Sequence, residues 1–382
     1  MAQPSPYTPG IVARWVPGRA PELAFFGERA QFIGGLGRFA GRITVYQAAR
    51  GVGKTSLLRQ AQLIFQQHGV QTLWVTANES ENLLETILRA MRDSLPAGQK
   101  AWQGVSESLD SLTVGVGSSG TGVKATLKRA GAPSSTATFK KALSAFAEAA
   151  RSAGGTGVVL LIDEVQSADK PSLRALAHAW QEFASEPAAL AAGLFAVGLP
   201  GSQEYLAKAV TFSERFAFHP LPDLGDAGVA EALRAPAEAI GVSWQPDALN
   251  LAIKEASGYP YKVQLIGDEV WRAARFPDAG AVIGEQHLRA ALPEVDRQMS
   301  ALHGARWRAA STRQRALLVA VAELGGVSVK RDEIAKLMGT TTGAISGVRD
   351  RLLRAGVIAA SDHGRLSFTV PGFTEYVLRH RD

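Results

Sequence analysis

The residues with the clearest chemistry lie in the segment 47–56, which reads Gln-Ala-Ala-Arg-Gly-Val-Gly-Lys-Thr-Ser. The largely apolar stretch 42–46 before it is typical of a strand, and the residues after it are typical of an amphipathic helix. A glycine-rich turn between a strand and a helix lets backbone N–H groups surround phosphate oxygens. Lys54 is expected to reach the β- and γ-phosphates, and Thr55 to ligate Mg²⁺. The segment therefore predicts a nucleoside triphosphate site.

One position departs from the pattern G-x-x-x-x-G-K-[ST]. Ala48 stands where the first glycine belongs, and an alanine is tolerated there if its backbone keeps a negative φ. The residues expected to contact the nucleotide from this loop are Arg50, Gly51, Val52, Gly53, Lys54, Thr55 and Ser56.

Two adjacent carboxylates form the second candidate group. The run 157–162 is apolar without interruption and leads into Asp163 and Glu164, as a buried parallel strand does at the sheet edge where ligands bind. Asp163 is expected to face the Mg²⁺ held by Thr55, and Glu164 to polarise a water for in-line attack on the γ-phosphate. The two motifs together predict an ATPase that uses ATP and Mg²⁺, with Lys54 and Glu164 as catalytic residues.

Length and composition bound the class of protein. A chain of 382 residues is expected to form two or three domains. The sequence has no window of about 18 apolar residues and begins without a basic or apolar leader, so we expect no membrane span, no signal peptide and a cytoplasmic location. The absence of cysteine excludes disulfides, thiolate zinc sites and cysteine nucleophiles, and the seven histidines show no metal-ligand spacing.

Positive charge is concentrated in the last fifth of the chain. Of the 41 Lys and Arg residues, thirteen lie in 301–382, against seven of the 35 Asp and Glu residues, so that the rest of the chain holds 28 of each sign. The whole net charge of +6 therefore belongs to this segment. Such an asymmetry favours contact with nucleic acid at the C-terminus.

The order of the expected elements indicates an α/β fold built on a parallel sheet. An amphipathic helix at 28–39 precedes the strands, which are expected at 42–47, 71–76, 158–163 and 190–199. Residues 1–222 would form the ATP-binding domain, interrupted by a glycine- and serine-rich insertion at about 96–136. The wholly helical part 223–283 would be a lid, and 284–382 a connecting helix and a further domain.

The C-terminal segment has the pattern of a winged helix-turn-helix. Helices are expected at 312–324, 330–338 and 342–355, and two strands at 357–361 and 365–370 would pair as the wing. The third helix would enter a major groove of duplex DNA, with phosphate contacts from Arg349, Arg351, Arg354 and Arg365. A winged helix that packs only against neighbouring domains or binds a protein is the alternative.

Several short motifs occur in order along the chain: Tyr7-Thr8-Pro9-Gly10, Gly27-Glu28-Arg29, the phosphate loop, Leu161 to Gln166, Gly258-Tyr259-Pro260-Tyr261 and Phe368 to Phe373. This series resembles the AAA+/STAND-type P-loop ATPases close to the origin-recognition clade, which carry a terminal winged helix. The resemblance implies a five-stranded parallel sheet, ATP rather than GTP, and a nucleotide clamped between sheet and lid.

The chain departs from that family pattern at residues that sense the nucleotide. Family members place a lid arginine against the γ-phosphate, and here Tyr261 occupies the matching position. Arg215 is the candidate for an arginine that acts on a neighbouring subunit's nucleotide, with a surface ion pair as the alternative. These departures favour slow hydrolysis or a nucleotide-state switch.

Two classes of function follow from these predictions. The first is an ATPase whose nucleotide state controls assembly or association with duplex DNA, with a homo-oligomer as a further partner. The second is a STAND-type signalling or defence switch, in which the winged helix is a regulatory or protein-binding module.

Overall fold

The computed structural model describes residues 3–95, 103, 106–107, 135–186, 190–360 and 364–381. The insertion predicted at about 96–136 lies almost entirely outside these described residues.

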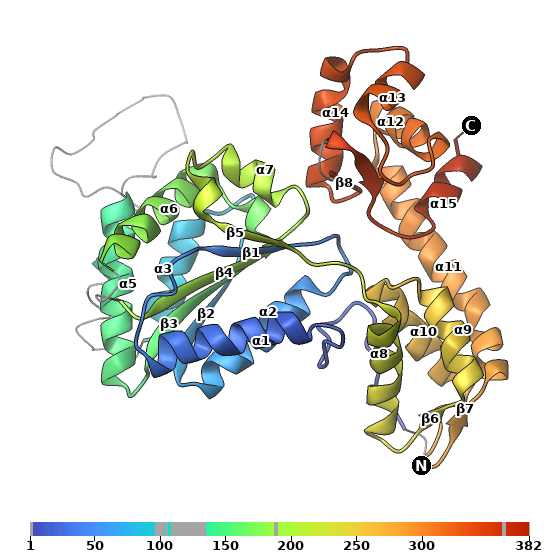
Figure 1. Cartoon of the computed structure of the whole chain (residues 1–382), viewed down its shortest axis with the longest axis horizontal. Coiled ribbons are helices and arrows are strands. Elements are labelled where there is room, and N and C mark those ends of the chain that lie inside the picture. The colour runs from blue at the N-terminus through green and yellow to red at the C-terminus, as the bar shows by residue number, and fades with distance from the viewer. Residues whose placement is uncertain are drawn as a thin grey trace.

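A five-stranded, wholly parallel sheet with the order β2-β3-β4-β1-β5 forms the centre of the N-terminal domain (Figure 1). This sheet confirms the predicted α/β P-loop fold. Its strands are β1 (Thr44–Gln47), β2 (Val70–Thr76), β3 (Gly157–Asp163), β4 (Ala192–Gly198) and β5 (Ala217–Pro220).

Helices cover both faces of the sheet (Figure 1), with α1 (Ala20–Ala30) and α2 (Lys54–Gln67) on one face. On the other face lie α3 (Leu83–Asp93), α5 (Ser135–Ser152) and α6 (Lys170–Ser185). Side chains of β3 alternate between the two apolar clusters: Val159 and Leu161 face the first, and the residues between and beside them face the second. Two-sided burial explains why this strand is an unbroken apolar run.

The first helix differs from the sequence-based expectation of 28–39. It begins at Ala20 with Pro21 in its first turn, where proline costs no hydrogen bond, and it continues into a π-helical turn, Gln31–Gly35. A Cβ at Gly34 would lie 2.8 Å from the carbonyl oxygen of His68, so this turn lies directly against the chain before β2. The helical structure therefore ends at Gly35, four residues before the predicted end at residue 39.

A helical lid follows the sheet. It contains α8 (Asp226–Glu238), α9 (Pro246–Ala256) and α10 (Pro260–Ala273), with a short parallel pair of strands, β6 (Ser243–Trp244) and β7 (Val282–Ile283). The start of the chain packs on this lid. Tyr7 is buried there and donates its hydroxyl to the Leu233 carbonyl, and the Trp271 indole donates to the Gln3 carbonyl at 2.9 Å. The predicted first domain, 1–222, thus includes a segment that lies on the lid.

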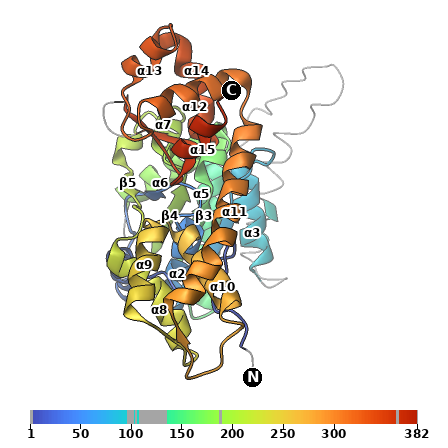
Figure 2. The same cartoon turned by 90° about the vertical axis from the view of Figure 1, so that its right-hand side faces the viewer.

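The long helix α11 (Glu285–Ala309) runs from the lid to the C-terminal domain (Figures 1 and 2). That domain has three helices and an antiparallel wing, which is the predicted winged helix-turn-helix: α12 (Thr312–Glu323), α13 (Arg331–Leu337), α14 (Thr342–Arg354), β8 (Ile358–Ala360) and β9 (Leu366–Phe368), followed by α15 (Phe373–Arg379). Its apolar cluster is separate from those of the sheet and lid. Within the described residues, the helices are too short or too polar to cross a membrane.

Candidate nucleotide site

The phosphate loop has the backbone that its glycines predict. Gly51 and Gly53 have φ angles of 85° and 92°, which L side chains rarely adopt, and Gly53 is the N-cap of α2. Ala48 is buried and is not among the residues with positive φ, so the condition for an alanine at that position is met. The loop thus presents the N-terminus of a fourteen-residue helix to a bound anion.

Lys54 lies beneath this loop, buried, with its ammonium donating to the Ala49 carbonyl at 2.9 Å. Burial lowers the pKa of Lys54 to about 8, and the nearby carboxylates of Glu164 and Asp163 oppose this shift. A buried ammonium with one hydrogen bond has donors left for phosphate oxygens.

Thr55 and Asp163 are brought together at the end of β3. The Thr55 hydroxyl donates to Asp163 Oδ2 at 2.9 Å, and burial raises the pKa of the Asp163 carboxyl. Mg²⁺ in ATPases takes one or two protein oxygens and completes its shell with waters and phosphates. The described residues contain no cluster of three or more His, Asp or Glu side chains that could bind a metal alone. The donor set therefore fits Mg²⁺ that arrives with a nucleotide.

Glu164 follows in a left-handed backbone conformation, with φ of 53°. Its N–H donates to Asp163 Oδ1 at 2.9 Å, and its carboxylate accepts a hydrogen bond from the side-chain amide of Gln166. A non-glycine residue in this region is strained, which is common at functional sites. The sequence motif contained Gln166, but its residue type alone did not indicate this contact.

The lid meets the phosphate loop at the start of α10. The Tyr261 N–H donates to the Gly51 carbonyl at 3.1 Å, and the Tyr259 hydroxyl donates to the Arg50 carbonyl at 2.8 Å. A cavity of about 450 Å³ lies between loop and lid, within the range of small-molecule sites. Its lining includes Arg50, Gly51, Gly53, Lys54, Thr55, Ser56, Glu164 and Tyr261. Val52 is buried and is not among the lining residues.

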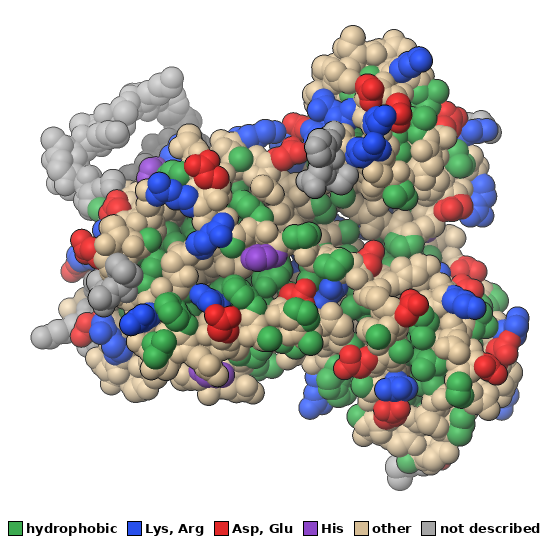
Figure 3. Space-filling view, viewed as in Figure 1, with side chains coloured by type: hydrophobic (Ala, Val, Ile, Leu, Met, Phe, Trp, Pro, Cys, Tyr) green, Lys and Arg blue, Asp and Glu red, His purple; other side chains and the backbone are tan. Residues whose placement is uncertain are grey.

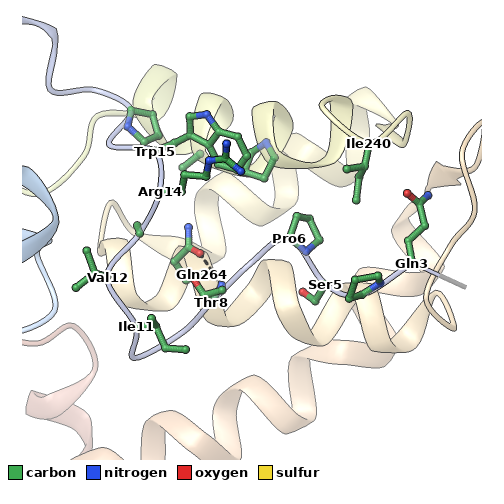
Figure 4. A pocket seen from close by; sticks show the side chains of 15 residues that line it. Gln3, Ser5, Pro6, Thr8, Ile11, Val12, Arg14, Trp15, Ile240 and Gln264 are labelled. Atoms are coloured by element: carbon green, nitrogen blue, oxygen red, sulfur yellow. Dashed lines mark hydrogen bonds between the residues drawn. The ribbon is translucent and has the colours of Figure 1, made fainter. Parts of the chain in front are cut away.

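The N-terminal segment completes this cavity, a contribution that the sequence analysis missed. Residues 8 and 10–13 line it, the Ala13 N–H donates to Ser56 Oγ at 3.0 Å, and Gln60 donates to the Arg14 carbonyl at 2.9 Å. Figure 4 shows the segment crossing the lid helices, with a second cavity of about 370 Å³ between them. Ile11 is 72% exposed there. The apolar residues Ile11 and Val12, in an otherwise polar N-terminal segment, could have indicated this contribution to the cavity.

A second arginine approaches the loop from the connecting helix. Arg306 of α11 donates to Thr369 Oγ1 at 3.1 Å. Burial lowers the pKa of Arg306, the nearby Tyr259 opposes the shift, and the charge of Arg50 adds to it. Within the described part of the chain, neither Arg50 nor Arg306 has a carboxylate partner. The junction of loop, lid and C-terminal domain is therefore cationic.

Arg215 lies at the other edge of the sheet. It ends the short 3₁₀ helix Ser213–Arg215 directly before β5 begins, whereas the phosphate loop follows the end of β1. The strands are parallel, so the two sites lie at opposite strand ends. Its side chain is exposed, forms no hydrogen bond or ion pair with the described residues, and does not line the nucleotide cavity.

The arginines predicted to contact DNA differ in their surroundings. Arg349 is only 8% exposed and pairs with Glu204 of α7 (Ser202–Ala207) at 3.0 Å, which corrects its assignment to a DNA phosphate in this arrangement. Arg354 lines a cavity between α7 and α14. Arg351 is exposed, and Arg365 donates to the Ser328 carbonyl at 2.8 Å. Figure 3 shows basic and acidic side chains mixed on one face of this domain.

Residues 16–191, which include the phosphate loop and both carboxylates, match the AAA ATPase domain family. This N-terminal part of the chain therefore resembles AAA ATPase domains. Residues 300–377 match a domain of unknown function, DUF8462. Comparison with curated protein sequences finds no match.

Solved structures with the same fold include two archaeal proteins. The Walker-type ATPase of Pyrococcus abyssi has a TM-score of 0.59 at 15% identity, over 99% of this chain and 99% of that chain. The ORC2 protein of Aeropyrum pernix in its ADPNP–ADP complexes has a TM-score of 0.56 at 16% identity, over 96% of this chain and 95% of that chain. These comparisons confirm the resemblance to P-loop ATPases, and the chain shares its fold with an origin-recognition protein.

Proposed function

We propose that this protein binds ATP with Mg²⁺, hydrolyses it slowly, and uses the nucleotide state to control how its winged helix is docked. The observation that carries the proposal is that Lys54, Thr55 and Glu164 line one cavity beside the lid, and that Asp163 accepts a hydrogen bond from Thr55 at its edge. Each has the chemistry that phosphoryl transfer needs: a cation for the β- and γ-phosphates, two oxygens for Mg²⁺, and a base for water. The fold shared with the ORC2 protein of Aeropyrum pernix, which was solved in ADPNP–ADP complexes and in an ADP form, supports nucleotide binding.

We expect slow turnover because the lid presents a tyrosine, and not an arginine, to this cavity. Tyr261 reaches it where an arginine would stabilise charge on the γ-phosphate, and a phenol carries no positive charge at neutral pH. Arg215 lies at the opposite strand ends, so it can act only on the nucleotide of a second copy. Removing charge stabilisation of this kind slows phosphoryl transfer by several orders of magnitude.

Duplex DNA is the partner that we propose for the C-terminal domain. The excess positive charge of the chain lies in 301–382, and the first turn of α14, which reads base edges in helix-turn-helix proteins, is exposed from Thr341 to Ala344. Arg351, Arg354 and Arg365 are the remaining candidates for phosphate contacts, since Arg349 is engaged elsewhere.

A STAND-type switch is the second candidate, and the docked position of α14 favours it. Arg349 pairs with Glu204 at 3.0 Å, and Asp350 pairs with Lys208 at 3.3 Å, so that the winged helix is attached to the ATPase domain next to the nucleotide site. A domain held in this way suits a module that is released by a ligand or protein partner.

Nucleotide titration of the full chain tests the proposal. Wild-type protein should bind ATP and ADP in the presence of Mg²⁺, and Lys54→Ala should lose most of that affinity, because Lys54 is the charge aimed at the phosphates. Lys141→Ala, which removes an exposed ammonium on α5, serves as the matched control and should bind like wild type. Full ATP affinity in Lys54→Ala, measured by calorimetry, would overturn the site assignment.

The two candidate functions predict different results for DNA binding and for the retention of ADP during purification. Salt-dependent binding of duplex DNA that changes between ATP and ADP supports the DNA-associated ATPase. Tightly bound ADP in the purified protein, together with no DNA affinity at low salt, supports the switch.

A further inference from the structure

Gln166 connects Glu164, the proposed catalytic base, to Leu199, the residue that follows β4. Its side chain is buried, and its amide nitrogen donates to the Glu164 carboxylate. Its Oε1 accepts from the Leu199 N–H at 2.9 Å. A Cβ at Gly198 would lie 2.7 Å from that oxygen, so the amide is closely packed as well as hydrogen-bonded. Both ends of the Gln166 amide are therefore fixed, one of them on Glu164.

The segment that holds Gln166 is the one on which the C-terminal domain docks. A Cβ at Gly356, which has φ of 68°, would lie 3.1 Å from the Leu199 side chain, and one at Gly201 would lie 3.7 Å from Leu353. A cavity of about 270 Å³ between α7 and α14 has Gln166 in its lining together with Leu199 and Leu353. Gln166 thus faces the interface between the two domains.

Two ion pairs fasten this interface. Arg349 pairs with Glu204 at 3.0 Å and Lys208 with Asp350 at 3.3 Å. The Arg349 side chain is 10% exposed, so its pair is less screened by solvent than an ordinary surface pair. The domain is attached to α7, which begins three residues after Leu199.

A restrained carboxylate is a poorer base. An N–H donor that bonds to a carboxylate stabilises its charged form and directs its lone pairs away from other partners. A general base must have its carboxylate within hydrogen-bond reach of the attacking water. While the Gln166 amide is hydrogen-bonded to the Glu164 carboxylate, this carboxylate is less often free to accept a proton from the attacking water.

We propose that Gln166 is a positioning residue that restrains Glu164, and that docking of the winged helix on residues 199–208 keeps this restraint in place. Undocking loosens the 199–208 segment, frees the Gln166 amide and releases Glu164 to the water beside the γ-phosphate. The inference rests on the proposed function, since it takes Glu164 as the base. It makes the winged helix a brake on ATP hydrolysis.

Steady-state ATPase assays on the full chain test this inference. Gln166→Ala removes the restraint directly, and Glu204→Lys breaks the docking pair by placing like charges together. Each should raise kcat about fivefold or more, a fraction of the 10²–10⁴ that a general base contributes, with KM unchanged. The double variant should not exceed the larger single effect, because both act through one hydrogen bond. Exchanging the charges in Glu204→Arg with Arg349→Glu should return kcat toward wild type.

Controls separate the possible failures. Glu148→Lys changes an exposed charge on α5 and should leave kcat as in wild type. Glu164→Gln should abolish turnover; if it does not, the proposed role of Glu164 fails. If Glu164→Gln abolishes turnover while Gln166→Ala lowers kcat or leaves it unchanged in a variant with wild-type melting temperature, the inference alone is overturned. Additive effects of Gln166→Ala and Glu204→Lys would also overturn it, since they would show two independent routes.

Discussion

Lys54 illustrates how one side chain serves two physical demands. It must be buried beneath the loop to reach phosphates, and that burial disfavours its charge, so its pKa falls to about 8. The nucleotide needs the charged form. Below pH 8 the free protein already holds the required proton, and above pH 8 it must take one up in order to bind.

ATP affinity should therefore depend on pH in a defined direction. We expect it to be constant near pH 7 and to fall above pH 8, approaching a limit of about tenfold per pH unit, because one proton is taken up on binding. Fluorescent-nucleotide titrations from pH 7 to 9.5 measure this. Lys54→Ala, which has no ammonium to titrate, should show weak affinity without the same slope. A wild-type affinity that stays constant up to pH 9.5 would contradict the assignment.

Residue types and spacing predicted which side chains lie together at the sheet edge, because few residue types can bind phosphate or Mg²⁺. Lys54, Thr55 and Asp163 converge as the motif spacing indicated, because strand ends of a parallel sheet meet at one edge. The role of Gln166 was not predictable, since its contact depends on the packing of β4 against β3. Arg349 was assigned to DNA from charge and helix position, and its burial depends on a neighbouring domain that the sequence does not place.

Among the elements, α10 has the most direct effect on the phosphate loop. Its N-terminus contributes Tyr259 and Tyr261, and the Tyr259 hydroxyl donates to the Arg50 carbonyl. A Cβ at Gly51 would lie 2.2 Å from that hydroxyl, so glycine is required there by the lid as well as by the loop's φ of 85°. Any side chain at position 51 would therefore collide with the Tyr259 hydroxyl of the lid.

Tyr259→Phe should weaken this coupling. Loss of the hydroxyl leaves the Arg50 carbonyl without that partner, at a cost of about 1 kcal/mol in the free energy of unfolding, and nucleotide affinity should fall because the loop is less ordered. Chemical denaturation and ADP titration measure the two effects. Tyr376→Phe in the C-terminal domain is the control. Equal behaviour of the two variants would show that the lid contact does not support the loop.

Element boundaries were less predictable than element types. The wing and the third helix of the C-terminal domain lie within a few residues of expectation, since turn residues and apolar spacing define them locally. The first helix begins eight residues earlier than predicted, at Ala20, because its start depends on Pro21 and its end on contact with the His68 carbonyl. The N-terminal segment gave no periodic signal for its place on the lid.

At the scale of the whole molecule, Arg215 lies at the strand ends opposite the phosphate loop, so the role predicted for it requires the nucleotide of a neighbouring copy. If it does, ATPase rate per subunit should rise with protein concentration, and Arg215→Ala should remove that rise, by up to about 10³–10⁵ for a complete arginine finger. Arg151→Ala on α5 is the control for a lost surface charge. A rate that never depends on concentration, or a rise that survives Arg215→Ala, would exclude this role.

DNA binding should rely on exposed arginines and not on the one in the interface. Arg351→Ala and Arg365→Ala should each reduce the salt slope of log affinity by about 0.9 on duplex DNA if each loses one phosphate contact. Fluorescence anisotropy with unrelated duplexes across a salt series measures this, with Arg234→Ala on the lid as control. Unchanged slopes would remove the winged helix from the DNA interface.

In the function that we propose, the nucleotide at the phosphate loop controls docking of the winged helix. The chain has no native cysteine, so Gln181→Cys on α6 and Lys336→Cys on α13 can carry a donor and an acceptor dye at exposed positions. We predict that transfer efficiency differs between ATP, ADP and no nucleotide in this protein, and that adding Lys54→Ala removes the difference. The same efficiency in all three conditions, in protein that demonstrably binds ATP, would contradict the account.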